Sequence, residues 1–153
     1  MKVLSLKIPP PLLALIFGIL MWLASMVFPG IEINLIIRLS LFLFIGSIGL
    51  VFTILGLLSF RKNKTTINPL TPDKATSLVQ NGIYDVTRNP MYVGLLIYLL
   101  AWAVFLSNLY TLPFIAVFVI YTNKFQIVPE EAALSRLFGE EFHSYQTRVR
   151  RWL

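Results

Sequence analysis

Four long runs of apolar residues dominate the chain, and each is a candidate for a membrane-spanning helix. They cover residues 10–28, 35–60, 90–106 and 109–128, and no charged residue lies in the middle of any of them. A helix needs about 20 mainly apolar residues to cross the hydrocarbon core of a bilayer. The pattern therefore predicts an all-α integral membrane protein with about four transmembrane helices in a single membrane domain.

The polar segments between these runs predict how the helices are connected. Residues 61–89 form the long hydrophilic connection, which contains the turn-forming pairs Asn68-Pro69, Thr71-Pro72 and Asn81-Gly82. Asn89 precedes Pro90, which is typical of a helix N-cap followed by the first helical position. Ser107-Asn108 is a very short link, so the third and fourth helices should form a tight antiparallel hairpin.

The tail, residues 129–153, has a different pattern. Its apolar residues recur at spacings of three and four, as in an amphipathic helix that lies on the membrane surface or docks against the other helices. These residues are Leu134, Leu137, Phe138, Phe142, Tyr145, Val149 and Trp152. We expect a C-terminal amphipathic cytoplasmic helix, and the pattern leaves open whether it is continuous through Gly139.

Composition supports a membrane protein and excludes several other classes. Only 13% of the residues are charged and 57% are hydrophobic, whereas a soluble domain usually carries about 25% charged residues. The basic residues behind the net charge of +6 flank the apolar runs, so lipid headgroups and topology explain them better than a nucleic-acid partner. The chain has no cysteine and one histidine, so we expect no disulfide and no metal site.

The distribution of Lys and Arg predicts the orientation of the chain. With a cytoplasmic N-terminus, four helices place both the 61–89 segment and the tail in the cytoplasm. Arg38 alone among the basic residues then lies near the outside, which satisfies the positive-inside rule. We therefore expect both termini in the cytoplasm and the protein in the plasma (inner) membrane.

Two groups of polar residues at the expected cytoplasmic boundary are candidates for a functional site. The first surrounds the start of the third helix, where free N–H groups favour an anion and Arg88 adds donors suited to a carboxylate or phosphate. The second begins with the adjacent carboxylates Glu130 and Glu131. Viewed separately, Arg88 also fits a positive-inside anchor, and Tyr84 and Tyr92 fit the aromatic belt of a membrane interface.

Together these groups resemble a known family. The matching positions are Gly82, Tyr84, Arg88, Asn89, Pro90, Tyr92 and Gly94, followed by Glu130, Glu131, Phe138, Gly139, Phe142 and Tyr145. In this order and spacing they resemble the integral membrane methyltransferases, which include the isoprenylcysteine carboxyl methyltransferases and the phospholipid N-methyltransferases. The resemblance covers residues 81–153, and the first two helices match only as hydrophobic helices.

The resemblance implies S-adenosylmethionine bound in a cytoplasm-facing pocket made by the third and fourth helices and the tail. The implied cofactor-binding residues are Tyr84, Arg88, Asn89, Pro90, Tyr92, Gly94, Glu130, Glu131 and Tyr145, and the implied catalytic residues are Arg88, Glu131 and Arg148. Many isoprenylcysteine enzymes have a histidine where this chain has Asn89. An asparagine can still donate a hydrogen bond to the cofactor, but it cannot carry a proton.

We therefore expect an S-adenosylmethionine-dependent methyltransferase that acts on a lipid-like or prenylated substrate at the cytoplasmic membrane face. Its acceptor is either a carboxylate, as in isoprenylcysteine carboxyl methylation, or a phospholipid amine. One alternative is a related enzyme that reduces a lipid with NADPH. The other is a non-enzymatic small membrane protein whose tail docks a partner. Membrane lipid is an expected partner in each case, and the pattern leaves the oligomeric state open.

Overall fold

The computed structural model describes residues 8–63 and 75–153, and every regular element in these two ranges is a helix. The expected turns at Asn68-Pro69 and Thr71-Pro72 lie outside the described residues. The helices are α1 (Pro10–Val27), α2 (Leu35–Lys62), the 3-10 helix η2 (Gly82–Asp85), α3 (Pro90–Leu106), the 3-10 helix η3 (Leu109–Thr111), α4 (Leu112–Thr122), the π-helix η4 (Asn123–Ile127) and α5 (Val128–Arg148).

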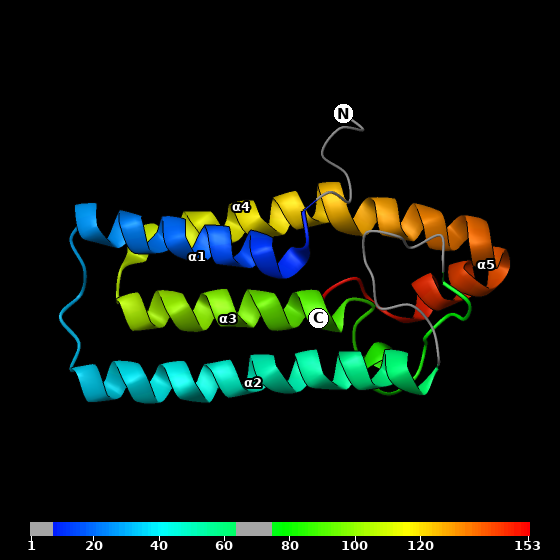
Figure 1. Cartoon of the computed structure of the whole chain (residues 1–153), viewed down its shortest axis with the longest axis horizontal. Coiled ribbons are helices and arrows are strands. Elements are labelled where there is room, and N and C mark those ends of the chain that lie inside the picture. The colour runs from blue at the N-terminus through cyan, green and yellow to red at the C-terminus, as the bar shows by residue number, and fades with distance from the viewer. Residues whose placement is uncertain (1–7, 64–74) are drawn as a thin grey trace.

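The long helices lie roughly parallel or antiparallel to one another, with α3 between α1 and α2 (Figure 1). A buried core joins α1, α3 and α4, and it contains Leu13, Phe17, Met21, Leu99, Ala103, Ile115 and Phe118. The rings of Phe17 and Phe118 meet edge to face at a centroid distance of 5.6 Å. The bundle is therefore centred on α3, which packs against α1 and α4 on one side and α2 on the other.

Glycines allow α2 and α3 to pack closely. A Cβ atom placed on Gly49 lies 2.9 Å from the carbonyl oxygen of Gly94, and one placed on Gly56 lies 2.9 Å from Cγ of Met91. Real side chains cannot approach so closely, so these positions admit only glycine without a local shift. Small residues of this kind commonly bring transmembrane helices together.

Three stretches of helix are long and apolar enough to cross a membrane: α1, α2 and the continuous run from η3 to α5. The remaining apolar helix, α3, has 17 residues and is slightly shorter. Most of the large apolar side chains of α2 are exposed on the outside of the bundle, where lipid tails can cover them. The prediction of an all-α membrane protein is confirmed.

The tail differs in two ways from a separate amphipathic helix. First, α5 continues directly from α4 through the π-helix, so the fourth apolar run and the tail share one helical axis at their junction. Second, α5 is broken at Gly139, whose φ of 48° and ψ of −122° are not helical. The part after the break turns back toward the bundle (Figure 1). Within the predicted apolar face, Leu137 does not pack against the bundle, because its side chain is 44% exposed.

Candidate active site

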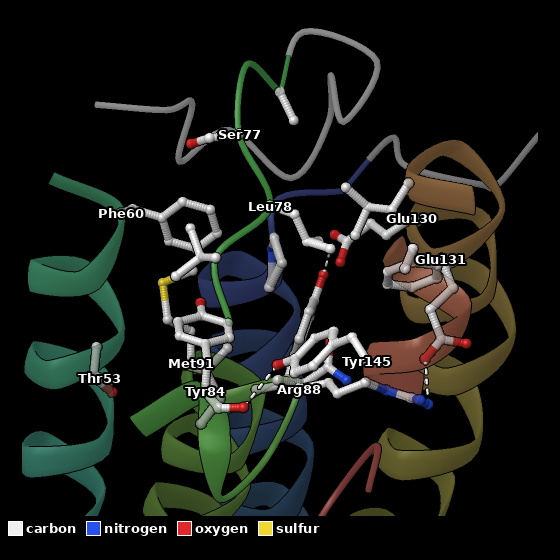
Figure 2. Close-up of a pocket in the computed structure, with 18 of the residues that line it drawn as sticks. Thr53, Phe60, Ser77, Leu78, Tyr84, Arg88, Met91, Glu130, Glu131 and Tyr145 are labelled. Carbon is white, nitrogen blue, oxygen red and sulfur yellow. Dashed lines mark hydrogen bonds and ion pairs between the residues drawn. The ribbon is translucent and has the colours of Figure 1, made fainter. Parts of the chain in front are cut away.

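A cavity of about 280 Å³ lies at the end of the bundle where α3 begins (Figure 2). It is close to the lower limit of about 300–1,000 Å³ typical of small-molecule sites. Its walls come from the start of α1, the end of α2, residues 75–79, η2, the start of α3 and α5. The lining residues are Pro10, Pro11, Thr53, Phe60, Ala75, Ser77, Leu78, Val79, Tyr84, Arg88, Asn89, Met91, Tyr92, Leu95, Glu130, Glu131, Leu134, Phe142 and Tyr145.

An ion-pair network forms one polar corner of this pocket. The Arg88 guanidinium donates to Oε1 of Glu131 at 2.9 Å and to the carbonyl oxygen of Gln146 at 3.1 Å. Arg151 donates to both oxygens of the same carboxylate, at 3.1 and 2.5 Å. Since two guanidinium groups share one carboxylate, the corner carries a net positive charge. The side chains of Arg88 and Glu131 are only 11% and 13% exposed, so water screens their interaction weakly.

A second polar corner pairs a carboxyl group with a phenol. The hydroxyl of Tyr92 donates to Oε1 of Glu130 at 2.6 Å. The pKa of Glu130 is raised to about 8, mainly by burial; the hydrogen bond from Tyr92 opposes the rise, and the nearby Glu131 carboxylate adds to it. Glu130 therefore carries a proton at neutral pH, although the next residue along the helix is ion-paired.

A hydrogen bond from one tyrosine to another closes one side of the pocket. The Tyr145 hydroxyl donates to the carbonyl oxygen of Tyr84 at 2.7 Å, and Figure 2 shows the two rings close together. Burial raises the pKa of both hydroxyls above the ordinary value, so both stay neutral. The bond joins the part of α5 beyond Gly139 to η2, and it closes the pocket across two segments that are distant in the sequence.

The start of α3 is built differently from the expected N-cap. Asn89 occupies the N-cap position, but its side chain makes no capping bond. Its amide Nδ2 instead donates to the carbonyl oxygen of Arg151 at 2.9 Å. The hydroxyl of Thr87 accepts from the Asn89 backbone N–H at 3.2 Å and donates to the same Arg151 carbonyl at 3.1 Å. Asn89 therefore anchors residues 149–152 against α3, and its side chain is not available for capping.

The structure brings most of the predicted site residues together. Those that line the pocket are Tyr84, Arg88, Asn89, Tyr92, Glu130, Glu131 and Tyr145. Pro90 and Gly94 do not line it and face α2 instead, against Gly56 and Gly49 respectively. Arg148 also lies outside the pocket, and its guanidinium donates to Oε1 of Gln80 at 2.9 Å.

Several lining and supporting residues were not predicted. Pro10, Thr53 and Phe60 come from the first two apolar runs, where no polar motif marks a site. Arg151 supports Glu131 from within the basic end of the tail, and only its distance from a carboxylate in the folded chain distinguishes it from Arg150. Among the described residues, no group of three or more His, Cys, Asp or Glu side chains is placed to hold a metal ion.

These features define a class of protein: a helical membrane protein with a pocket at one end of the bundle, which has a mainly apolar lining and charged groups on the side of α5. The phospholipid methyltransferase family model matches residues 35–141, and the chain belongs to this family. The match includes the start of α3 and the Glu130-Glu131 pair and ends before Tyr145 and Arg151.

Two relatives extend this comparison. The chain is 28% identical to protein-S-isoprenylcysteine O-methyltransferase B of Arabidopsis thaliana over 145 residues, which cover 90% of this chain and 70% of that protein. It is 43% identical over 63 residues to an uncharacterized protein of Haemophilus influenzae, over 41% of this chain and the whole of that protein. No solved structure matches the chain. The expected resemblance is confirmed, and the protein is a membrane methyltransferase of the isoprenylcysteine or phospholipid type.

Proposed function

We propose that the protein transfers a methyl group from S-adenosylmethionine to a lipid-like acceptor at the cytoplasmic face of the membrane. The observation that carries this proposal is that one pocket contains both the charged corner of Arg88 and Glu131 and an apolar wall from α1, α2 and α3. A water-soluble cofactor and a lipid chain need different surroundings, and this cavity offers both side by side.

The polar corners fit the chemistry of the cofactor. When bound, S-adenosylmethionine supplies a methyl group activated by a positively charged sulfur. Nε of Arg88 is buried and has no hydrogen-bond partner, so it can donate to an anionic group. Leaving a buried donor without a hydrogen bond costs free energy. Glu130 and Glu131 can accept hydrogen bonds from hydroxyl or amino groups. The ion pair between Arg88 and Glu131 keeps these two side chains next to each other in the pocket.

The apolar wall supports a lipid-like or prenylated acceptor. Phe60, Met91 and Leu95 line the pocket on the side of the membrane helices, and α3 separates α1 from α2 along the bundle (Figure 1). A carboxylate acceptor is nucleophilic at neutral pH without a base. Whether the acceptor is a carboxylate or an amine, the main task of the protein is to align it with the methyl group and exclude water. Such orientation lowers the activation free energy by up to about 7–11 kcal/mol in favourable cases.

A phospholipid amine is the second candidate acceptor, and Glu130 is the observation that favours it. An ammonium group must lose a proton before it can attack the methyl group. A buried carboxyl group with a pKa of about 8 is ionised in a fraction of the molecules near neutral pH, and its ionised form can accept that proton. With a carboxylate acceptor, the same group has no proton to remove.

The first experiment is equilibrium binding of S-adenosylhomocysteine to the purified protein in detergent, with NADPH as the comparison ligand. We expect saturable binding of S-adenosylhomocysteine alone. Arg88→Ala and Glu131→Gln should each weaken it about tenfold or more, because a hydrogen bond to a charged group contributes about 1.5–3 kcal/mol. Glu140→Gln is the matched control, since Glu140 lies on the same helix and is exposed.

The alternatives give different results in the same experiment. Binding of NADPH alone supports the reductase, and binding of neither ligand by folded protein supports a non-enzymatic role. If the wild type binds S-adenosylhomocysteine and neither Arg88→Ala nor Glu131→Gln weakens it, the cofactor is bound elsewhere and the site assignment is wrong.

A further inference from the structure

We propose that Arg151 is a positioning residue, which holds the Glu131 carboxylate in its binding orientation from outside the pocket. The proposal rests on the proposed function, because the purpose of this orientation is to bind the cofactor. Arg151 is not a lining residue of the cavity, so any effect it has on a ligand passes through the residues that it holds.

The backbone of residues 149–152 is anchored across the start of α3. The Arg88 N–H donates to the carbonyl oxygen of Arg150 at 2.9 Å. The carbonyl oxygen of Arg151 accepts from both Thr87 and Asn89. Trp152 donates from Nε1 to Oδ1 of Asn123 in the π-helix at 3.0 Å. These bonds connect the segment to α3 and to η4, and they fix where the Arg151 side chain begins.

The Arg151 side chain then determines how Glu131 is oriented. Its Nε and terminal nitrogen contact different oxygens of the carboxylate, at 3.1 and 2.5 Å. This two-point contact fixes the plane of the carboxylate as well as its position. Arg88 contacts only Oε1, so Arg88 alone leaves the carboxylate free to rotate about that contact.

The partial exposure of the Arg151 side chain distinguishes a role in orienting Glu131 from a role in stabilising the fold. The side chain of Arg151 is 35% exposed, whereas that of Glu131 is 13% exposed. A partly exposed ion pair contributes little to folding because water screens it. Replacing Arg151 should therefore leave the fold intact while releasing a carboxylate that the pocket needs in one orientation.

The test is a double-mutant cycle read out by S-adenosylhomocysteine affinity and by thermal unfolding of the same samples. We expect Arg151→Gln to weaken binding about tenfold with little change in the unfolding temperature. Arg150→Gln is the control: Arg150 is exposed, and its backbone carbonyl survives the substitution. In the Glu131→Gln background, Arg151→Gln should have no further effect, because coupled residues are not additive.

Arg151→Lys gives an independent check. A lysine keeps the charge but cannot contact both carboxylate oxygens in the same plane, so we expect an affinity between those of the wild type and Arg151→Gln. The proposal is overturned if Arg151→Gln leaves the affinity for S-adenosylhomocysteine unchanged. It is also overturned if Arg151→Gln weakens binding by the same factor in the Glu131→Gln background as in the wild type. If the wild type itself binds no S-adenosylhomocysteine, the proposed function fails first and this inference fails with it.

Discussion

Glu130 and Glu131 are neighbours in the sequence with different chemical surroundings. Glu131 is shared between two guanidinium groups, whereas Glu130 is buried beside the phenol of Tyr92. When the surroundings of two adjacent carboxyl groups differ in this way, the groups are suited to different tasks. The Glu131 side chain fits a fixed negative charge, and that of Glu130 fits a group that gains and loses a proton.

The raised pKa of Glu130 predicts a pH dependence that distinguishes two ligands. Below about pH 8 Glu130 is protonated, so a cationic sulfonium compound binds beside a neutral group. As the pH rises through that value the carboxylate forms and attracts the cation. The affinity for S-adenosylmethionine, relative to the uncharged thioether of S-adenosylhomocysteine, should therefore increase several-fold from about pH 6 to pH 9.

Glu130→Gln is the control for this titration. The glutamine keeps a carbonyl oxygen that can accept the Tyr92 hydroxyl, but it cannot ionise. The ratio of the two affinities, measured by calorimetry at several pH values, should become independent of pH in this variant. The same slope in Glu130→Gln as in the wild type contradicts the prediction and assigns the titration to another group.

The candidate residues that the sequence offered and that line the pocket belong mostly to local motifs. Arg88 and Tyr92 adjoin the start of one helix, and Glu130 and Glu131 are adjacent, so their chemistry is visible without a fold. Arg151 was not assigned because its partner lies 20 residues earlier. The sequence marked Gly139 as a possible break in the tail helix but left open whether the helix is broken there, so it did not predict that Arg151 returns to Glu131.

At the scale of elements, the contact between α2 and α3 positions the site. The pocket lies at one end of this helix pair, with Thr53 and Phe60 on α2 and Met91 and Tyr92 on α3. Gly94 sets the spacing between the helices near that end. A shift of either helix changes the distance between the apolar wall and the rest of the cavity.

Gly94→Ala should therefore destabilise the protein. The added methyl group overlaps the Thr53 hydroxyl and lies 2.8 Å from the carbonyl oxygen of Gly49, and such overpacking costs about 1–3 kcal/mol. Gly18→Ala is the matched control, because its methyl group lies 4.0 Å from Cδ1 of Trp102, an ordinary van der Waals distance. We expect a lower unfolding temperature in detergent for Gly94→Ala alone; equal temperatures for both variants contradict the packing argument.

The helices themselves were predictable from the apolar runs, since α1 and α3 each begin at a proline that the sequence marks. The tail was predicted less accurately. The positive φ of Gly139 allows the chain to change direction there. Any glycine permits such a change, but a glycine in the sequence does not require it. The sequence likewise gave no sign of the π-helix from Asn123 to Ile127, which lies just before Glu130 and Glu131.

On the scale of the whole molecule, the two ends of the bundle have different character. One end holds the pocket and the basic residues Arg61 and Lys62 at the end of α2. The opposite end holds the links between α1 and α2 and between α3 and α4 (Figure 1). There Arg38 donates to the carbonyl oxygen of Phe105 at 2.5 Å, and Asn108 donates to that of Phe28 at 2.8 Å.

The difference between the two ends predicts the orientation of the protein in the membrane, with the pocket end in the cytoplasm. Because the chain contains no cysteine, a single introduced cysteine is the only thiol. Glu32→Cys and Ser144→Cys replace exposed residues at the two ends. A membrane-impermeant maleimide should label Glu32→Cys in intact cells, and Ser144→Cys only after the membrane is opened. The reverse pattern contradicts a cytoplasmic pocket.

The anchoring of residues 149–152 has a consequence for biosynthesis. A ribosome adds about 5–20 residues per second, and Arg151 follows Glu131 by 20 residues, so the arginine is made about one to four seconds later. During this interval α1, α2 and α3 have already been synthesised, and of the two guanidinium groups that contact Glu131 in the folded protein, only that of Arg88 has been made. The apolar helices α1, α2 and α3 are thus synthesised before the two-point contact between Arg151 and Glu131 can form.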